Sequence, residues 1–325
     1  MRKNWARSAC HDARSSGRRA ARLGPLAWLT LGVAMSLGAL VFAGGPAPVE
    51  AQSYSAYSDT EKPAIAFLLS DESNAEEFQA EFGLSDEEME RVLAAVREEN
   101  ETLARAYAES EQEIEASRGE PEGAVSDYNT AVREAVAKTK SSIETFLPEN
   151  RVPELHEWVD TRFVQEGQEA AADAVGTDGF SADRARGVRC KVYASYYYGH
   201  TRYEVALPHR KLKFRGGFRV PIRPVKGGRG DRPPVKEVGP WNTYDNYWQS
   251  GDKRDMWRSL RRCVPEAQAA YFDNYNKGED EFGRKVRNPA GVDLTPAAAK
   301  KLGIKSRIQR KGIVRVYVRF PWVRR

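Results

Sequence analysis

Aromatic residues and short polar side chains are interleaved in one segment of the chain. Residues 242–248 read Asn-Thr-Tyr-Asp-Asn-Tyr-Trp. Sugar rings stack their C–H faces on such aromatic side chains while Asp and Asn bond the hydroxyl groups, so the pattern favours a carbohydrate platform. The candidate substrate-binding residues are Trp241, Asp245, Tyr247 and Trp248. The alternative is that these aromatics form a satellite core under a long loop.

Cysteine and histidine offer little further chemistry. Of the three cysteines, Cys10 lies in an N-terminal segment that we interpret below as a cleaved export signal, so Cys190 and Cys263 remain in the mature chain. Two cysteines in an exported domain most often form a disulfide. The alternative is two unpaired buried thiols. His156 has no second His or Cys at ligand spacing, and the acidic run at 273–280 lacks the spacing of an EF-hand. We therefore expect no metal and no cofactor.

The charge is distributed unevenly. The chain has 51 Lys+Arg and 46 Asp+Glu in 325 residues. Residues 52–182 hold 10 bases and 31 acids, whereas residues 183–325 hold 34 bases and 13 acids. This change of sign predicts a domain boundary. The 41% hydrophobic content excludes a wholly disordered chain, and 30% charged residues exclude a multi-spanning membrane protein.

The N-terminus has the order of an export signal. Residues 1–25 hold seven bases and one acid, an apolar run follows at 26–43, and Val49-Glu50-Ala51 puts small residues at −3 and −1. This order predicts a signal peptide at 1–51, cleaved after Ala51 or after Ala43. The alternative is an uncleaved anchor helix, because the apolar run is near the lower spanning limit. Cleavage leaves 44 bases, 44 acids and no stable membrane span. The export route stays open.

The acidic segment at 52–171 predicts an α-helical domain. Ser85 and Glu88 have the spacing of a capping box, and apolar residues recur at three- and four-residue steps after them. Two or three amphipathic helices with a turn at 119–123 would bury these stripes against one another. The many glutamates are interpreted as a solvated face. Residues 172–187, rich in Ala, Gly and Asp, are expected to be a linker.

The basic segment at 188–325 changes to a period of two. Apolar residues alternate with arginine or aromatic residues at 188–194, 218–222 and 314–320, which predicts half-buried strands in a closed or nearly closed barrel. One short helix is expected after Thr295 as N-cap, with Pro296 in its first turn and Gly303 as its stop.

Four segments in this half resemble the rare lipoprotein A-like double-psi β-barrel family. Residues 291–304, Gly-Val-Asp-Leu-Thr-Pro-Ala-Ala-Ala-Lys-Lys-Leu-Gly-Ile, are similar to the family's C-terminal signature. Residues 193–199 resemble its opening strand, and residues 209–214 and 237–241 fall where it has its histidine and Asp-Arg-Gly-Pro segments. The resemblance implies an all-β double-psi barrel at 188–325 with an insertion at 242–291, and so an α+β multidomain chain.

The resemblance also implies a cell-wall context. Members include lytic transglycosylases that act on peptidoglycan glycan strands, and the same barrel occurs in expansins. By position, Glu237 matches the family's catalytic-type Asp, His209 its companion histidine, and Asp293 an acid that is functional in the expansin branch. Glu237 departs from the family by one methylene, and the insertion at 242–291 is longer than usual.

Three functions stay open. The first is lytic-transglycosylase-like cleavage of peptidoglycan by one acid/base carboxylate, Glu237, with His209 and Asp293 assisting. The second is a non-catalytic, expansin-like module that binds wall polysaccharide, and the third is a scaffold whose helices bind a protein partner. We expect the protein to be exported to the extracellular space, cell wall or periplasm. Anionic wall polymers are further expected partners, whereas nucleic acid is not, because no recognition motif is present.

Overall fold

The computed structural model describes residues 55–117, 121–176, 187–196 and 202–323. The expected signal peptide at 1–51 lies outside these residues, as does most of the expected linker. Residues 52–325 form one compact unit. Within the described ranges, no helix is long and apolar enough to cross a membrane.

The N-terminal part of this unit is helical, as the sequence predicts. Its α-helices in the described residues are α1 (Ala64–Leu69), α2 (Glu72–Phe82), α3 (Asp86–Ala116), α4 (Glu122–Glu144) and α5 (Val152–Gly176). The capping box before α3 is confirmed, because the Glu88 carboxylate accepts the Ser85 N–H at 2.8 Å and the Ser85 hydroxyl accepts the Glu88 N–H at 3.3 Å. The helix α5 extends to Gly176, into the expected linker, since alanine is the best helix former.

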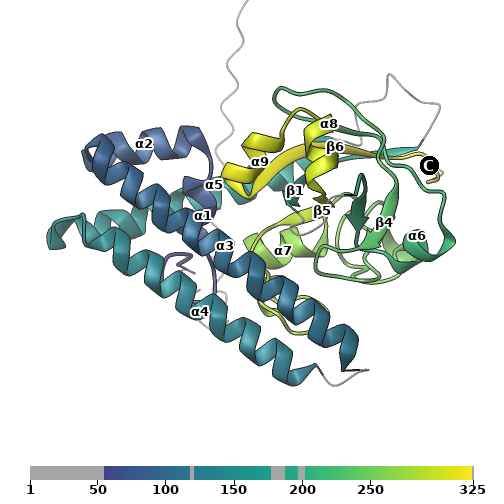
Figure 1. The fold of residues 1–325 in the computed structure, drawn as a ribbon, viewed down its shortest axis with the longest axis horizontal. Coiled ribbons are helices and arrows are strands. Elements are labelled where there is room, and N and C mark those ends of the chain that lie inside the picture. Colours follow the sequence, from purple (N-terminus) through teal and green to yellow (C-terminus); the bar gives the residue numbers. More distant parts are fainter. Residues whose placement is uncertain (1–54, 118–120, 177–186, 197–201, 324–325) are drawn as a thin grey trace, which may run out of the picture. The chain divides into compact units, whose positions relative to one another are not determined.

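The long helices α3 and α4 run side by side (Figure 1) and bury the predicted stripe. Met89, Val92, Val96 and Leu103 of α3 are buried, and so are Val132, Val136 and Ile143 of α4. The same buried cluster includes residues from the C-terminal part, namely Trp241, Ala267, Ala270, Tyr271 and Val286. The expected insertion thus packs against the helices.

The C-terminal part is built on a mixed six-stranded sheet. Its strands are β1 (Val188–Tyr196), β2 (Val205–Leu207), β3 (Ile222–Pro224), β4 (Val235–Val238), β5 (Ala290–Leu294) and β6 (Ile313–Phe320), in the order β3-β6-β1-β5-β2-β4. β1 is parallel to β5 and β2 to β4, whereas the other neighbours are antiparallel. Every second residue of β6 is buried, as its sequence alternation predicts.

This part is not all-β, contrary to the expectation. It also contains α6 (Arg210–Arg215), α7 (Glu266–Asp273), α8 (Pro296–Lys301) and α9 (Lys305–Lys311), so the chain is α+β. The predicted short helix is α8, whose N-cap Thr295 accepts the Ala298 N–H at 3.3 Å. The six-stranded sheet is not closed. Isolated bridges, Arg219–Pro234 and Ile222–Asp231, join the segments next to its two edge strands.

Ion pairs join the acidic helices to the basic strands. Arg315 of β6 contacts Glu169 at 3.1 Å and Asp173 at 2.8 Å, both on α5. Asp173 also contacts Lys191 of β1 at 2.7 Å. Opposite charges of the two parts of the sequence therefore meet within one unit.

Cys190 and Cys263 form a disulfide, as the sequence predicts. Cys190 lies on β1 and Cys263 in the segment that connects β4 to α7. Both residues are almost fully buried. The bond therefore fixes part of the insertion to the centre of the sheet.

Replacing both cysteines by alanine is expected to lower the free energy of unfolding by about 4 kcal/mol, because the unfolded chain regains the freedom of a loop of about 70 residues. Denaturant unfolding of the chain from residue 52 measures this loss, with each single Cys→Ala variant as a control. Alkylation of two thiols per unreduced native chain, detected by mass spectrometry, would contradict the bond.

Candidate active site

A cleft of about 1490 Å³ is lined by α3 and by the C-terminal part of the chain. From α3 it takes Tyr107 and Glu111 among others, and from the sheet it takes Ser195, Glu237 and Asp293. Two of the residues to which the family resemblance points, Glu237 and Asp293, therefore line one cleft. His209 does not line it.

The strand register brings these two acids to one level of the sheet. Ala206 on β2 is the register partner of Asp293 on β5 and of Glu237 on β4, and Ser195 on β1 is the partner of Asp293. Neighbouring strands lie about 4.8 Å apart, so the Cα atoms of the two acids are separated by about 10 Å. Residues at one level project from the same face, which explains why both carboxyl groups reach the cleft.

Asp293 is the buried acid of this row. Burial raises the pKa of its carboxyl group to about 6, against the opposing effects of the Ser195 hydroxyl and the Arg287 charge. Ser195 Oγ donates a hydrogen bond to Asp293 Oδ1. Near Oδ2 stands Gly239, at φ +132°, and a Cβ there would lie 3.6 Å from this oxygen. Ser195 thus engages Oδ1, and Oδ2 lies beside the backbone of Gly239.

Glu237 is less buried and lies in an ion pair. The Lys213 ammonium of α6 donates to Glu237 Oε1, which also accepts the Val238 N–H at 3.0 Å. Both contacts use the same oxygen. Within the described part of the chain, the hydrogen bonds of the Glu237 side chain all use Oε1, so Oε2 at the cleft wall is available to a ligand.

His209 has a structural position. Its ring is buried, which lowers its pKa against the opposing effect of Asp255, and Nε2 lies 3.0 Å from Asp255 Oδ2. The backbone of His209 pairs with Tyr244, and the N–H of Arg210 donates to the Thr243 carbonyl at 2.8 Å. His209 thus holds the start of α6 against the loop that enters the insertion.

The predicted sugar platform is mostly in the interior. Tyr247 and Trp248 belong to the buried cluster of the sheet, where Trp248 stacks on Phe320 with centroids 4.5 Å apart. Asp245 is buried in an ion pair with Arg254. Only Trp241 of the four candidates lines the cleft. The exposed rings at the cleft are instead Phe214, 69% exposed, and Tyr244, 40% exposed.

The wall formed by α3 was missed by sequence reasoning. Tyr107 Oη accepts the Trp241 N–H at 3.1 Å, and the Arg287 guanidinium lies over both rings, 5.4 Å from the Tyr107 centroid and 5.8 Å from that of Trp241. Glu111 pairs with Arg284. No local pattern distinguishes Glu111 from the other glutamates, which were interpreted as a solvated face, because its partner lies far away in the sequence.

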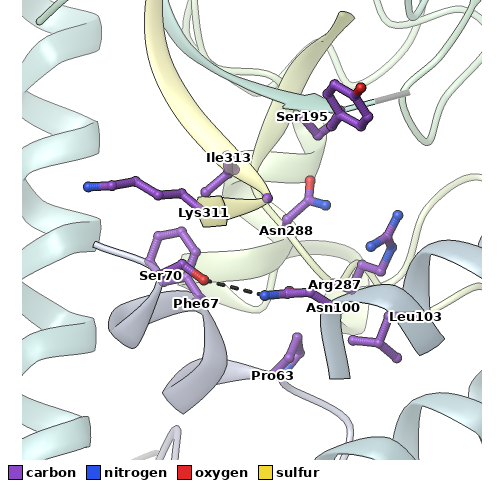
Figure 2. Close-up of a pocket in the computed structure, with 12 residues that line it drawn as sticks. Pro63, Phe67, Ser70, Asn100, Leu103, Ser195, Arg287, Asn288, Lys311 and Ile313 are labelled. Atoms are coloured by element: carbon purple, nitrogen blue, oxygen red, sulfur yellow. Dashed lines mark hydrogen bonds between the residues drawn. The ribbon is translucent and has the colours of Figure 1, made fainter. Parts of the chain in front are cut away.

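A second, much smaller cavity adjoins the cleft. It measures about 30 Å³ and shares Ser195, Arg287 and Asn288 with the cleft lining (Figure 2). A hydrogen bond of 3.4 Å from Asn100 to the Ser70 hydroxyl crosses its lining. Its volume is that of about one water molecule. We therefore place the candidate site in the large cleft.

Metal ligation finds no support in the described ranges, where no three His, Cys, Asp or Glu side chains are grouped to hold an ion. Within the acidic run at 273–280, Asp280 is fully buried and binds the Arg284 guanidinium at 2.7 Å. The guanidinium cation thus occupies the carboxylate that a calcium ion would need as a ligand.

The comparisons with known proteins identify one similar family. Residues 187–316 are similar to a family described as "Domain of unknown function (DUF8814)". The matched range contains β1 to β5, the first half of β6 and the sheet residues of the cleft, but not α3. The chain matches no curated protein and no solved structure.

The pKa of Asp293 gives a testable stability profile. Because its folded-state pKa of about 6 exceeds the ordinary 3.8, the stability linked to this group is complete below about pH 3.8 and is lost as the pH rises through about 6. The variant Asp293→Asn should therefore gain stability over wild type across this window, by about 3 kcal/mol.

Urea unfolding of both proteins from pH 4 to pH 8 measures this difference. Glu99, with a pKa of about 7, and Glu266, with a pKa of about 9, titrate in both proteins and cancel. The exposed Asp252→Asn change is the control and should give a flat difference curve. A flat curve for Asp293→Asn as well would show that Asp293 does not titrate as described.

Proposed function

We propose that the chain is an exported bacterial cell-wall protein that cleaves peptidoglycan glycan strands in this cleft by acid/base catalysis. The observation that carries the proposal is Asp293 at the wall of a cleft of about 1490 Å³, buried so that its pKa rises to about 6, with Glu237 at the same level of the sheet. A carboxyl group whose pKa lies near the working pH is suited to proton transfer. The resemblance to lytic transglycosylases and expansins points to the same substrate.

The chemistry needs one carboxyl group that gives and then recovers a proton. Asp293 Oδ2–H protonates the glycosidic oxygen as its bond to the anomeric carbon breaks. The 6-hydroxyl of the same muramic residue then attacks the anomeric carbon, forms the new C–O bond and returns its proton to Asp293. No water molecule enters, the products are a free 4-hydroxyl and a 1,6-anhydro end, and the acid is restored.

The roles differ from those that the resemblance implies by position. Asp293 is assigned the acid/base role because it is buried and has a raised pKa. Glu237, an ion-paired carboxylate, would face the positive charge that develops at the anomeric carbon. His209 is a positioning residue, because its ring binds Asp255 and does not line the cleft.

We include in this proposal that the C-terminal part folds as a double-psi β-barrel. It is supported by the parallel pairs β1–β5 and β2–β4 and by hydrogen bonds between the segments beside the edge strands, such as Val220 N to the Pro233 carbonyl at 3.1 Å and Val235 N to the Phe218 carbonyl at 2.9 Å. These bonds link the residues just before β3 to the start of β4 and the residues before it.

A non-catalytic polysaccharide-binding module is the second candidate. Among the described residues, the exposed large apolar side chains are Val164, Phe214 and Tyr244, and the last two line the cleft. Exposed rings beside a groove provide stacking surfaces without any need for proton transfer. Binding and cleavage are therefore tested separately.

The test is incubation of the chain from residue 52 with purified glycan strands, followed by analysis of 1,6-anhydro-muramic ends. Wild type should form these ends. Its kcat/KM should fall as the pH rises above about 6, because the Asp293 carboxyl group then loses its proton. Asp293→Asn should lower kcat by about 10²–10⁴-fold. Glu237→Gln should have a smaller effect of about 10-fold on kcat.

The exposed variant Asp252→Asn serves as the matched control and should behave as wild type. If wild type makes no anhydro ends but co-sediments with walls, catalysis is wrong and the binding module holds. If Asp293→Asn is as active as wild type while Glu237→Gln is inactive, the acid/base role belongs to Glu237.

A further inference from the structure

Outside the cleft, a cationic surface is formed where the loop between β3 and β4 meets α8 and α9. It consists of Lys226, Arg229, Lys300, Lys301, Lys305 and Arg307. All but Arg307 are exposed, and none lines the cleft.

Close backbone packing fixes this surface. The Arg229 N–H donates to the Leu302 carbonyl at 3.0 Å, and Arg229 Nε donates to the Lys301 carbonyl at 2.5 Å. A Cβ at Gly228 would lie 2.5 Å from the Leu302 carbonyl oxygen, so only glycine allows this approach. The ends of α8 and the loop are thus held together before any ligand arrives.

The charges of this surface are not neutralised by the helical part. Lys191 and Arg315 of the sheet pair with acids on α5, and Lys311 at the end of α9 pairs with Asp71, which precedes α2. None of the six cations forms an ion pair with an acid of the described residues. Arg307 Nε is buried and has no hydrogen-bond partner there.

Acidic side chains are almost absent from the segments that build the surface. No Asp or Glu follows Asp293 in the sequence, and the loop carries only Asp231. Asp231 accepts hydrogen bonds from Tyr203 Oη at 2.6 Å and from the Arg232 N–H at 2.8 Å. In these segments the six cations therefore face one acid, which is already hydrogen-bonded and whose charge interacts with those of Lys301 and Arg229.

The kind of side chain exposed on the cationic surface limits the class of ligand that it can bind. The exposed large apolar side chains of the described residues, Val164, Phe214 and Tyr244, all lie outside this surface, and the Tyr203 ring is covered by Lys301 Nζ at 3.6 Å. Single-stranded nucleic acid needs rings on which bases stack, and a bilayer needs apolar side chains that insert. A chain of phosphates needs only cations.

We propose that this cationic surface binds a linear polymer of closely spaced phosphate groups, separately from the glycan cleft. Arg229 and Arg307 offer forked donors to phosphate oxygens, and the lysines supply point charges. Each neutralised phosphate releases counterions, so binding weakens steeply with salt. The surface would hold the protein on an anionic polymer while the cleft remains open.

The test is fluorescence anisotropy with end-labelled long-chain inorganic polyphosphate and the chain from residue 52, at 50 to 200 mM NaCl. Wild type should bind, with log K falling linearly against log salt. The double change Lys226→Glu/Lys300→Glu should weaken binding about 10-fold or more at 50 mM NaCl. Asp293→Asn should bind as wild type, which separates this result from the fate of the catalytic proposal.

The matched control is Lys253→Glu/Arg261→Glu, which changes the net charge equally at exposed positions outside the surface. It should weaken binding by less than about 3-fold. Equal weakening by the two double variants, or no binding of wild type at 50 mM NaCl, would overturn the proposal. So would tighter binding to oligo(dT) of the same charge, or to phosphatidylglycerol vesicles, than to polyphosphate.

Discussion

Arg284 is a fully buried cation, and the junction between the helices and the sheet depends on how it is satisfied. Its guanidinium binds Asp280 at 2.7 Å, donates to the Trp241 carbonyl at 3.2 Å and pairs with Glu111 of α3. It also lies 4.7 Å from the centroid of the Tyr107 ring. A buried charge that loses one partner costs about 3–5 kcal/mol, so α3 cannot leave this position without exposing or orphaning Arg284.

The residues that hold α3 against the sheet at Arg284 also form one wall of the candidate site. Tyr107 and Glu111, which help to hold Arg284, also line the cleft opposite the row of Ser195, Asp293 and Glu237. The wall that α3 provides also contributes to the electrostatics of the sheet, since the charge of Glu111 helps to raise the pKa of Asp293. A fragment that began at residue 183 would keep the strands but lose this wall.

Local chemistry was predictable from the sequence, and long-range partners were not. The caps at Ser85 and Thr295 follow from short-range hydrogen bonds, and the alternation of β6 follows from its burial on one side. The disulfide needed only two cysteines and an export signal. Arg284 and Glu111 are 173 positions apart, and nothing in either neighbourhood marks them as partners. The contribution of Glu111 to the pKa of Asp293 likewise joins residues of α3 and β5 that lie far apart in the sequence.

The division of charge along the sequence has two different consequences in the folded chain. Where α5 lies against β1 and β6, acids and bases form ion pairs. The side chains of Lys191, Asp173 and Arg315 in these pairs are each about one fifth exposed. Such pairs add orientation more than stability, because the desolvation of each charge offsets its attraction. Where α8 meets the loop after β3, the six cations form no ion pair with an acid of the described residues, and a backbone hydrogen bond from Arg229 to Leu302 holds these like charges close together. That arrangement costs free energy through mutual repulsion, and a bound polyanion would relieve it. The zero net charge of the chain after residue 51 is therefore compatible with a surface on which cations outnumber acids among the described residues.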